Sequence, residues 1–211
     1  MKTYKNYIID FGGVIYEISQ LATYQAFMAL STDDSFLRKL ELKQVLDFQI
    51  FKDYEIGKIS SAEFRKSTIS KFSLVCSDEE FDSAWNKTLV GLFDYSAESI
   101  KKLKKNGNIF LLSNTNKIHF DYFYGECKEI FEIFDKCYYS FELGLRKPNS
   151  DIYEFVLNDL KINPEETIFL DDSLENLLGA SRIGISTCQI SNDLTLSDFL
   201  HSVENNTQQK P

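Results

Sequence analysis

Short apolar runs recur at wide spacing along this chain, and each is followed by a polar or glycine-containing turn. The runs are Tyr7 to Ile9, Ile109 to Leu112, Cys137 to Tyr139, Ile168 to Leu170 and Ile185 to Ile190. Runs of this length without polar alternation are typical of parallel strands that are buried on both faces. Helical patterns separate the later runs, as at Ser96 to Lys105 before the Asn106-Gly107 stop. This alternation predicts an α/β fold with an open parallel sheet and right-handed crossovers.

Between the first strand and the later ones lies a segment with a different pattern. Its apolar residues fall at helical spacing, as at Phe81, Trp85 and Leu89, and it contains no strand-like run. Because the first strand must pair with strands that follow this segment, we expect a small α-helical cap inserted into a Rossmann-like core. The predicted division is a core of residues 1–16 and 93–204, a helical cap of residues 17–92, and a disordered tail of residues 205–211.

Composition restricts the classes of partner. The chain has 211 residues and a formal net charge of −9, so it lacks the surplus of basic residues that nucleic-acid binding normally requires. No apolar stretch approaches the roughly 20 residues of a membrane-spanning helix. The four cysteines are widely spaced without a CxxC pair. We therefore expect a soluble cytoplasmic protein with reduced thiols and with neither a nucleic-acid nor a membrane partner.

Polar residues follow four of the predicted strands. Asp10-Phe11-Gly12-Gly13 follows the first, Ser113-Asn114 the second, and Asp171-Asp172 the fourth, while Lys147-Pro148 opens the helix after the third. The carboxyl ends of parallel strands share one edge of an open sheet, and ligands bind there. The order therefore predicts that three carboxylates, a hydroxyl and a lysine converge on one crevice.

Three carboxylates in one desolvated site repel one another, and either protonation or a bound cation relieves the repulsion. Mg²⁺ prefers oxygen ligands and bridges to substrate phosphates, while Lys147 adds one positive charge. Ser113 and the backbone N–H groups after it could hold phosphate oxygens, and Gly12 and Gly13 would allow close approach of the backbone. Each motif alone could be only a turn or a helix cap. Their common position at strand ends favours a phosphate-handling site.

The same residues resemble a known family. The segments Ile9 to Ile15, Leu112 to Asn116, Gly144 to Pro148 and Phe169 to Ser173 are similar to the four motifs of haloacid dehalogenase-like hydrolases. Tyr54 to Ser60 and Ala84 to Asn86 resemble the branch that contains bacterial α-glucose-1-phosphate phosphatases.

This resemblance implies a role for each motif residue. Asp10 would be the nucleophile, and Ser113 and Lys147 would position the phosphoryl group. Asn114, the residue after Ser113, is expected to bind phosphate with its backbone N–H. Mg²⁺ would be bound by Asp10, by the carbonyl of Gly12 and by Asp172, and Asp171 would lie beside the metal.

One position departs from the family pattern. The typical motif has a second Asp two residues after the nucleophile, where it acts as general acid/base, and Gly12 stands there instead. A substrate with an acidic leaving group, such as the anomeric hydroxyl of a sugar 1-phosphate, would depend less on this acid. Alternatively, a carboxyl from the cap linker could replace it, and Glu17 is the candidate.

These observations favour a Mg²⁺-dependent phosphomonoester hydrolase that forms an aspartyl phosphate and acts on a small sugar phosphate. A haloacid dehalogenase on the same fold and a non-catalytic binding or regulatory protein are the alternatives. His119 is interpreted as an ordinary polar helix residue and Trp85 as a core residue. Glu55, before the turn at Gly57, could face either the site or water.

Overall fold

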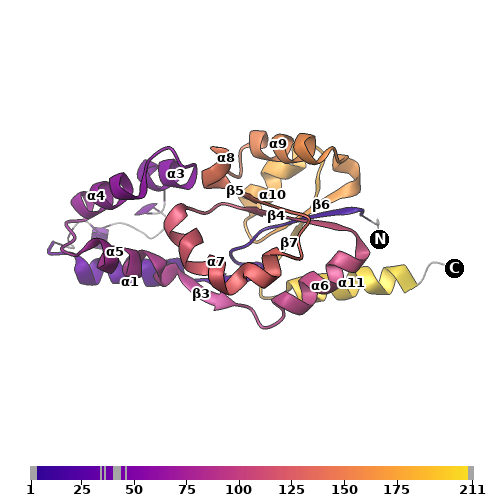
Figure 1. The fold of residues 1–211 in the computed structure, drawn as a ribbon, viewed down its shortest axis with the longest axis horizontal. Coiled ribbons are helices and arrows are strands. Elements are labelled where there is room, and N and C mark those ends of the chain that lie inside the picture. Colours follow the sequence, from indigo (N-terminus) through magenta and orange to yellow (C-terminus); the bar gives the residue numbers. More distant parts are fainter. Residues whose placement is uncertain (1–3, 34, 36, 40–43, 46, 209–211) are drawn as a thin grey trace.

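The computed structural model describes residues 4–33, 35, 37–39, 44–45 and 47–208. A five-stranded sheet with the order β5-β4-β1-β6-β7 forms its centre, and all neighbouring strands are parallel (Figure 1). The strands are β1 (Asn6–Ile9), β4 (Asn108–Ser113), β5 (Lys136–Tyr139), β6 (Thr167–Asp171) and β7 (Ser186–Gln189). The predicted α/β class with an open parallel sheet is confirmed.

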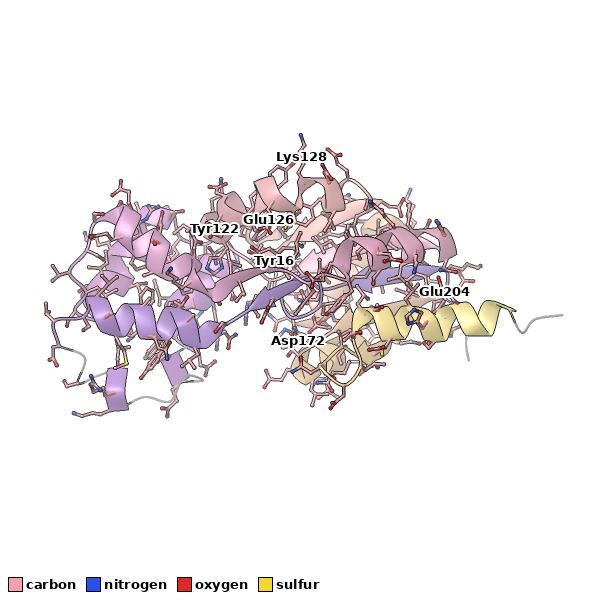
Figure 2. The ribbon with its side chains drawn as sticks, turned by 90° about the horizontal axis from the view of Figure 1, so that it is seen from below. Tyr16, Tyr122, Glu126, Lys128, Asp172 and Glu204 are labelled. Atoms are coloured by element: carbon pink, nitrogen blue, oxygen red, sulfur yellow. The ribbon has the colours of Figure 1, made fainter. Side chains whose placement is uncertain are left out.

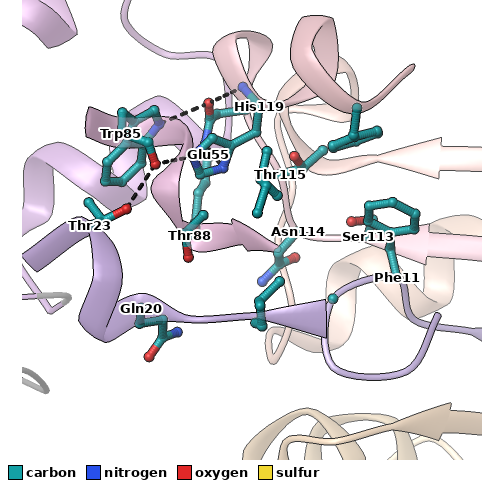
Figure 3. A pocket seen from close by; sticks show the side chains of 15 residues that line it. Phe11, Gln20, Thr23, Glu55, Trp85, Thr88, Ser113, Asn114, Thr115 and His119 are labelled. Atoms are coloured by element: carbon teal, nitrogen blue, oxygen red, sulfur yellow. Dashed lines mark hydrogen bonds between the residues drawn. The ribbon is translucent and has the colours of Figure 1, made fainter. Parts of the chain in front are cut away.

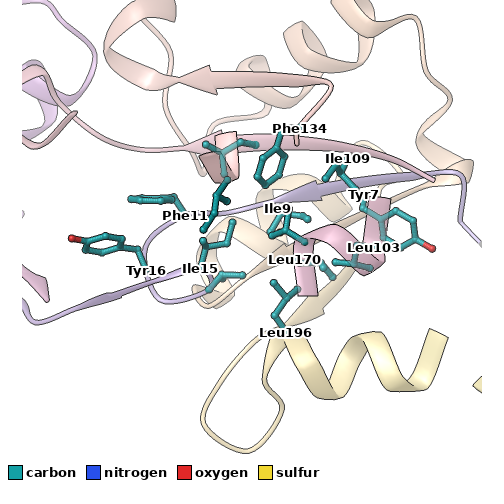
Figure 4. Packing of buried hydrophobic residues seen from close by; sticks show 14 of the residues in the cluster. Tyr7, Ile9, Phe11, Ile15, Tyr16, Leu103, Ile109, Phe134, Leu170 and Leu196 are labelled. Atoms are coloured by element: carbon teal, nitrogen blue, oxygen red, sulfur yellow. The ribbon is translucent and has the colours of Figure 1, made fainter. Parts of the chain in front are cut away.

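The central strand shows why the apolar runs lack polar alternation. Successive side chains of β1 point to opposite faces, and every residue of the strand is buried. Tyr7 and Ile9 pack on one face, whereas Ile8 packs on the other. Figure 4 shows the first of these cores, with Ile9 beside Leu170 and Tyr7 beside Ile109. Both faces of the sheet are therefore covered.

Helices from different parts of the chain supply these covers. The face of Tyr7 and Ile9 is covered by α6 (Ser96–Asn106), α7 (Lys117–Phe131) and α11 (Leu196–Gln208). The face of Ile8 is covered by α9 (Ser150–Leu160) and α10 (Leu174–Ser181). Two shorter elements, α8 (Ser140–Leu143) and the 3-10 turn η3 (Pro164–Glu166), precede α9 and β6. No helix in the described ranges is long and apolar enough to cross a membrane.

A second group of helices lies beside the sheet and has its own core (Figure 1). Aromatic rings dominate this core, and Phe51 stacks on Trp85 with ring centroids 5.4 Å apart. Ser60 and Glu63 form a capping box at the start of α4 (Ser61–Lys71). The elements are α1 (Gln20–Leu30), η1 (Leu37–Lys39), α3 (Gln49–Glu55), α4 (Ser61–Lys71), α5 (Asp78–Trp85) and η2 (Asn86–Thr88).

The prediction that residues 17–92 are all helical is wrong at both ends. The chain leaves the sheet through β2 (Tyr16–Ile18) and returns through β3 (Leu89–Leu92), and these strands pair antiparallel. Strands of three and four residues are too short to show a period of two, so helical periodicity nearby hid them. Tyr16 ties this two-stranded neck to α7, because its hydroxyl donates to Glu126 Oε2 at 2.9 Å (Figure 2).

The predicted disordered tail is also partly wrong. Residues 205–208 belong to α11, whereas residues 209–211 lie outside the described residues. Once the apolar first turns of α11 pack against the sheet, each further helical residue adds a hydrogen bond without a new nucleation step. A helix can therefore extend into polar residues that have no apolar periodicity of their own.

The helical group contacts the sheet domain along one edge. Ser140 Oγ at the start of α8 donates to the carbonyl of Glu55 at 2.6 Å, and the Ile118 N–H donates to the Tyr54 hydroxyl at 3.1 Å. Gly57 has a φ of +65°, and a Cβ there would lie 2.2 Å from the carbonyl oxygen of Phe141. Only glycine fits this turn without displacing the backbone of α8.

Candidate active site

Three aspartates meet at the carboxyl ends of the two central strands. Asp10 directly follows β1, Asp171 ends β6, and Asp172 follows it. One carboxylate oxygen from each lies within 4.8 Å of the others. The parallel pairing of β1 with β6, which places Ile9 opposite Leu170, brings these residues to the same edge. A cluster of oxygen atoms with this spacing could hold a hard divalent cation.

Lys147 is the cation nearest to this cluster, and its side chain is only 1% exposed. Its ammonium lies 2.7 Å from Asp10 Oδ1 and 2.7 Å from Asp171 Oδ2, and it donates to the Leu112 carbonyl at 2.9 Å. Burial lowers the pKa of Lys147, but the two carboxylates outweigh it and the net shift is upward. One ammonium cannot neutralise three carboxylates, so the cluster keeps an excess of negative charge.

The two oxygens of Asp10 have different surroundings. Oδ1 accepts from Lys147 and from the Phe11 N–H at 2.7 Å, whereas Oδ2 has no hydrogen bond to any residue that the structure describes. Burial raises the pKa of Asp10 well above its ordinary value, Asp171 raises it further, and Lys147 opposes the shift. The carboxylate is thus held in a fixed orientation with one oxygen available for a ligand or for bond formation.

Asp171 and Asp172 differ in their surroundings. Asp171 is fully buried and accepts from the Ser173 N–H at 2.8 Å and from Asn176 Nδ2 at 3.0 Å, in addition to Lys147. Asp172 is exposed at the surface (Figure 2), and partial burial and the charge of Asp171 raise its pKa. Asp171 is therefore suited to positioning Lys147, and Asp172 to binding a cation from solvent.

Gly13 is required for the approach of Asp172. Its φ is +77°, and a Cβ there would lie 2.4 Å from Asp172 Oδ2. A side chain at this position would both strain the backbone and displace the carboxylate. Gly12 does not contact Asp172 in this way and lines the cavity that is described below.

The end of β4 positions Lys147. The Asn114 side chain accepts from the Lys147 N–H and donates to the Lys147 carbonyl, both at 3.0 Å. The Thr115 N–H, one of the donors that the sequence analysis assigned to phosphate, donates to Ser140 Oγ at 2.9 Å instead. The buried Ser113 hydroxyl makes no hydrogen bond to the described part of the chain, so it could still bind a phosphate oxygen.

A cavity of 150 Å³ opens beside these residues, between the sheet edge and the helical group (Figure 3). Its lining includes Gly12, Ser113 and Asn114 from the sheet edge. The remaining lining residues are Phe11, Ile18, Gln20, Thr23, Glu55, Trp85, Thr88, Leu89, Thr115, Asn116, His119 and Phe123.

His119 lines this cavity, although its sequence pattern is that of an ordinary polar helix residue. Its ring stacks on Trp85 with centroids 4.7 Å apart and an interplanar angle of 17°. Nε2 lies 3.2 Å from the Trp85 carbonyl oxygen, which can only accept, so Nε2 carries the proton and Nδ1 accepts from Asn116 Nδ2 at 3.1 Å. Burial lowers the pKa of His119 to about 4. The ring is therefore neutral at physiological pH, with both nitrogens occupied.

Glu55 and Arg146 form an ion pair between the helical group and the loop that carries Lys147. Arg146 Nε and Nη2 lie 3.0 and 2.9 Å from the same oxygen, Glu55 Oε2. Burial raises the pKa of Glu55, and Arg146 opposes this shift. From sequence, Glu55 was expected to face either the site or water, and no partner was predicted for Arg146. The position of Arg146 directly before Lys147 was the one sequence signal that it lies near the site.

Glu17, the predicted substitute for the missing acid, lies elsewhere. It is exposed on β2 and lines a second pocket together with Gly13 and Asp172, and Ser113 does not line that pocket. The structure does not bring Glu17 into the cavity. The other predicted residues lie around the carboxylate cluster or line the cavity.

Comparison with known proteins gives consistent matches over most of the chain. Residues 4–184 match the family described as haloacid dehalogenase-like hydrolase. A D-ribitol-5-phosphate phosphatase of Bacteroides thetaiotaomicron is 34% identical over 197 residues, covering 89% of this chain and 92% of the relative.

Two solved structures are also similar. A haloacid dehalogenase family enzyme of the same organism, crystallised with magnesium and inorganic phosphate, is 34% identical with a TM-score of 0.77, covering 89% of this chain and 94% of that one. A predicted hydrolase of this family from Porphyromonas gingivalis is 25% identical with a TM-score of 0.80 and covers all of both chains.

Proposed function

Because the chain belongs to the haloacid dehalogenase-like hydrolase family, we propose that it is a Mg²⁺-dependent phosphatase with Asp10 as its nucleophile. The observation that carries this proposal is the carboxylate cluster around Lys147, at the edge of a cavity that also contains Ser113. The relative named as a phosphatase and the structure crystallised with magnesium and phosphate support the same activity and the same cofactor.

The cluster fits Mg²⁺ in donor type and in charge. All three side chains offer carboxylate oxygens, and their excess negative charge favours a divalent cation. Asp10 and Asp172, with the carbonyl of Gly12, would hold the ion, and Asp171 would lie beside it. When bound, Mg²⁺ supplies positive charge to the phosphoryl group and to the nucleophile.

In the proposed reaction, an oxygen of Asp10 attacks phosphorus in line with the leaving oxygen. The new bond joins the carboxylate oxygen to phosphorus, and the bond between phosphorus and the leaving oxygen breaks, so that this oxygen takes a proton from water and departs as an alcohol. Water then attacks the aspartyl phosphate and releases inorganic phosphate and the free carboxylate. Lys147 and the Ser113 hydroxyl would stabilise the phosphoryl oxygens, which carry most of the charge during the transfer.

The proposed substrate is a small phosphorylated polyol or sugar. D-Ribitol 5-phosphate is suggested by the similar phosphatase, and glucose 1-phosphate by the motif resemblance at Tyr54 to Ser60. The helical group from α1 to η2 would act as the cap that encloses the leaving group. Gly12 in place of the usual acid would favour substrates whose leaving oxygen needs little protonation, such as an anomeric hydroxyl.

The two alternatives have less support. A dehalogenase that attacks carbon has no use for Asp172, an acid whose approach to the nucleophile requires the space left by Gly13. A non-catalytic role would not require the orientation of Asp10 by Lys147 and the Phe11 N–H.

A phosphate-release assay would test the proposal. The purified protein should be assayed with D-ribitol 5-phosphate, glucose 1-phosphate, nucleoside monophosphates and p-nitrophenyl phosphate, each with Mg²⁺ and with EDTA. We expect Mg²⁺-dependent turnover with a clear preference for the polyol or sugar phosphate. Turnover of none of these esters would contradict the phosphatase proposal, and equal rates on all of them would contradict the proposed substrate class.

A further inference from the structure

The cavity has two chemically different ends. Gly12 and Ser113 lie at the end beside the carboxylate cluster, where the phosphoryl group would bind. The cap lines the other end with several polar side chains, so the leaving group of a substrate would meet them (Figure 3). A polar group can bind a ligand only if its donor or acceptor atoms are not already paired with other atoms of the protein.

Two of the polar groups are already used. Thr23 Oγ1 donates to the Trp85 carbonyl at 2.9 Å, and His119 Nε2 donates to the same oxygen at 3.2 Å. His119 Nδ1 is paired with Asn116. These side chains hold the wall of the cavity in place and have no donor left for a ligand.

Glu55 is in the opposite situation. Both contacts of Arg146 fall on Oε2, and Oε1 accepts no hydrogen bond from any described residue. The side chain is 29% exposed, and it lines the cavity. Thr88, at the end of η2, also lines the cavity, and its hydroxyl has no partner within the described ranges. One strong acceptor and one hydroxyl thus remain available on the cap side, together with the exposed amide of Gln20 at the start of α1.

From this arrangement we propose that Glu55 and Thr88 form a subsite that binds a hydroxyl group of the leaving group and so selects hydroxylated phosphomonoesters over apolar ones. This inference rests on the proposed phosphatase function. Arg146 is a positioning residue, because it holds Oε2 and leaves Oε1 without a partner among the described residues. The subsite is formed by the cap, whereas the phosphate end is formed by the sheet.

The selectivity has a physical cause. A hydroxyl that donates to Oε1 replaces the water that this carboxylate loses when a substrate fills the cavity. An apolar leaving group cannot do so and would leave a charged oxygen desolvated. Making a hydrogen bond to a charged group, compared with leaving that group unpaired, typically changes an equilibrium or rate constant by roughly 10- to 100-fold. We expect a preference of this size from Glu55 and a smaller one from Thr88.

Two substrates of equal length separate hydroxyl recognition from phosphate chemistry. D-Ribitol 5-phosphate and 1-pentyl phosphate carry the same phosphate on five-carbon chains, with and without hydroxyl groups. The kcat/KM for both should be measured for wild type, Glu55→Gln, Thr88→Val and the control Glu142→Gln, which changes an exposed glutamate of α8. In Glu55→Gln the amide oxygen can keep the contact with Arg146 and an amide N–H₂ then faces the ligand, so the acceptor is lost.

We expect wild type to prefer the ribitol ester. Glu55→Gln should lose roughly 10-fold or more on that ester and less than about threefold on the pentyl ester. Thr88→Val should show the same pattern with a smaller loss, and Glu142→Gln should match wild type on both. Equal losses on both esters in Glu55→Gln and Thr88→Val, or no loss on either, would overturn the subsite. A wild-type protein inactive on both esters would overturn the proposed function, and the subsite with it.

Discussion

Replacing Lys147 with Met should destabilise the protein strongly when no divalent cation is present. The ammonium is 1% exposed and lies 2.7 Å from each of two buried carboxylates, so the variant leaves Asp10 and Asp171 facing each other without their shared partner. Removing one member of a buried ion pair typically costs about 3–5 kcal/mol. With an m-value of about 2 kcal/mol/M, the midpoint of urea unfolding should fall by roughly 1.5–2.5 M.

The matched control is Lys136→Met. Lys136 pairs with Asp159 at the surface, where the two side chains are 49% and 34% exposed, so its loss should change the free energy of unfolding by less than about 1 kcal/mol. Both variants and wild type should be unfolded in urea with EDTA, followed by circular dichroism. If Lys147→Met were no less stable than Lys136→Met, the account of Lys147 as the buried counter-charge would be wrong.

Adding Mg²⁺ extends this experiment. The cation neutralises the same carboxylates and binds only the folded site, so it should stabilise both proteins by mass action. The gain should be larger in Lys147→Met, where the uncompensated negative charge is greater. If the midpoint of urea unfolding were the same in Mg²⁺ as in EDTA for both proteins, the result would contradict a metal site at the cluster.

Three further predictions concern the metal and the cavity wall. Gly13→Ala should raise the Mg²⁺ concentration for half-maximal activity at least about 10-fold, because its Cβ would displace Asp172, whereas Gly125→Ala, in open space on α7, should leave it unchanged. Asp172→Asn should also weaken Mg²⁺ binding, and excess Mg²⁺ should restore part of its activity; an equal Mg²⁺ requirement in wild type and variant would count against the ligand assignment. Because the pKa of His119 is lowered to about 4, the fluorescence of Trp85, the only tryptophan, should stay constant from pH 8 to about pH 5.5 and change below that; a transition near pH 6.5 would show an ordinary histidine.

The sheet and the carboxylate cluster could be predicted from sequence because both depend on local signals. A strand buried on both faces needs a continuous apolar run, as in Tyr7 to Ile9, and the residue after such a run lies at the sheet edge whatever the rest of the chain does. Asp10 and Asp171 were located in this way. The roles assigned to them remain predictions for the assays proposed above.

Other features depend on contacts that no local pattern reveals. The strands β2 and β3 exist because the two ends of the cap meet, although 70 residues separate Ile18 from Leu89 in the chain. His119 reads as a polar helix residue, and only the packing of the cap places Trp85 against it. Ile18 lines the cavity and Glu17 does not. Neighbouring residues on a strand point to opposite faces, and the spacing of residues in the sequence does not show which of the two faces the cavity.

The most direct test of the central claim is to look for the phosphoryl group on Asp10. Wild-type protein and Asp10→Asn should be mixed with excess D-ribitol 5-phosphate and Mg²⁺, quenched in acid within the first turnovers, and analysed by peptide mass spectrometry. We predict one added phosphoryl group on the wild-type peptide that contains Asp10, none in EDTA, and neither this adduct nor phosphate release in Asp10→Asn. Steady phosphate release by Asp10→Asn at the wild-type rate, or a phosphoryl group on a different residue, would contradict the mechanism.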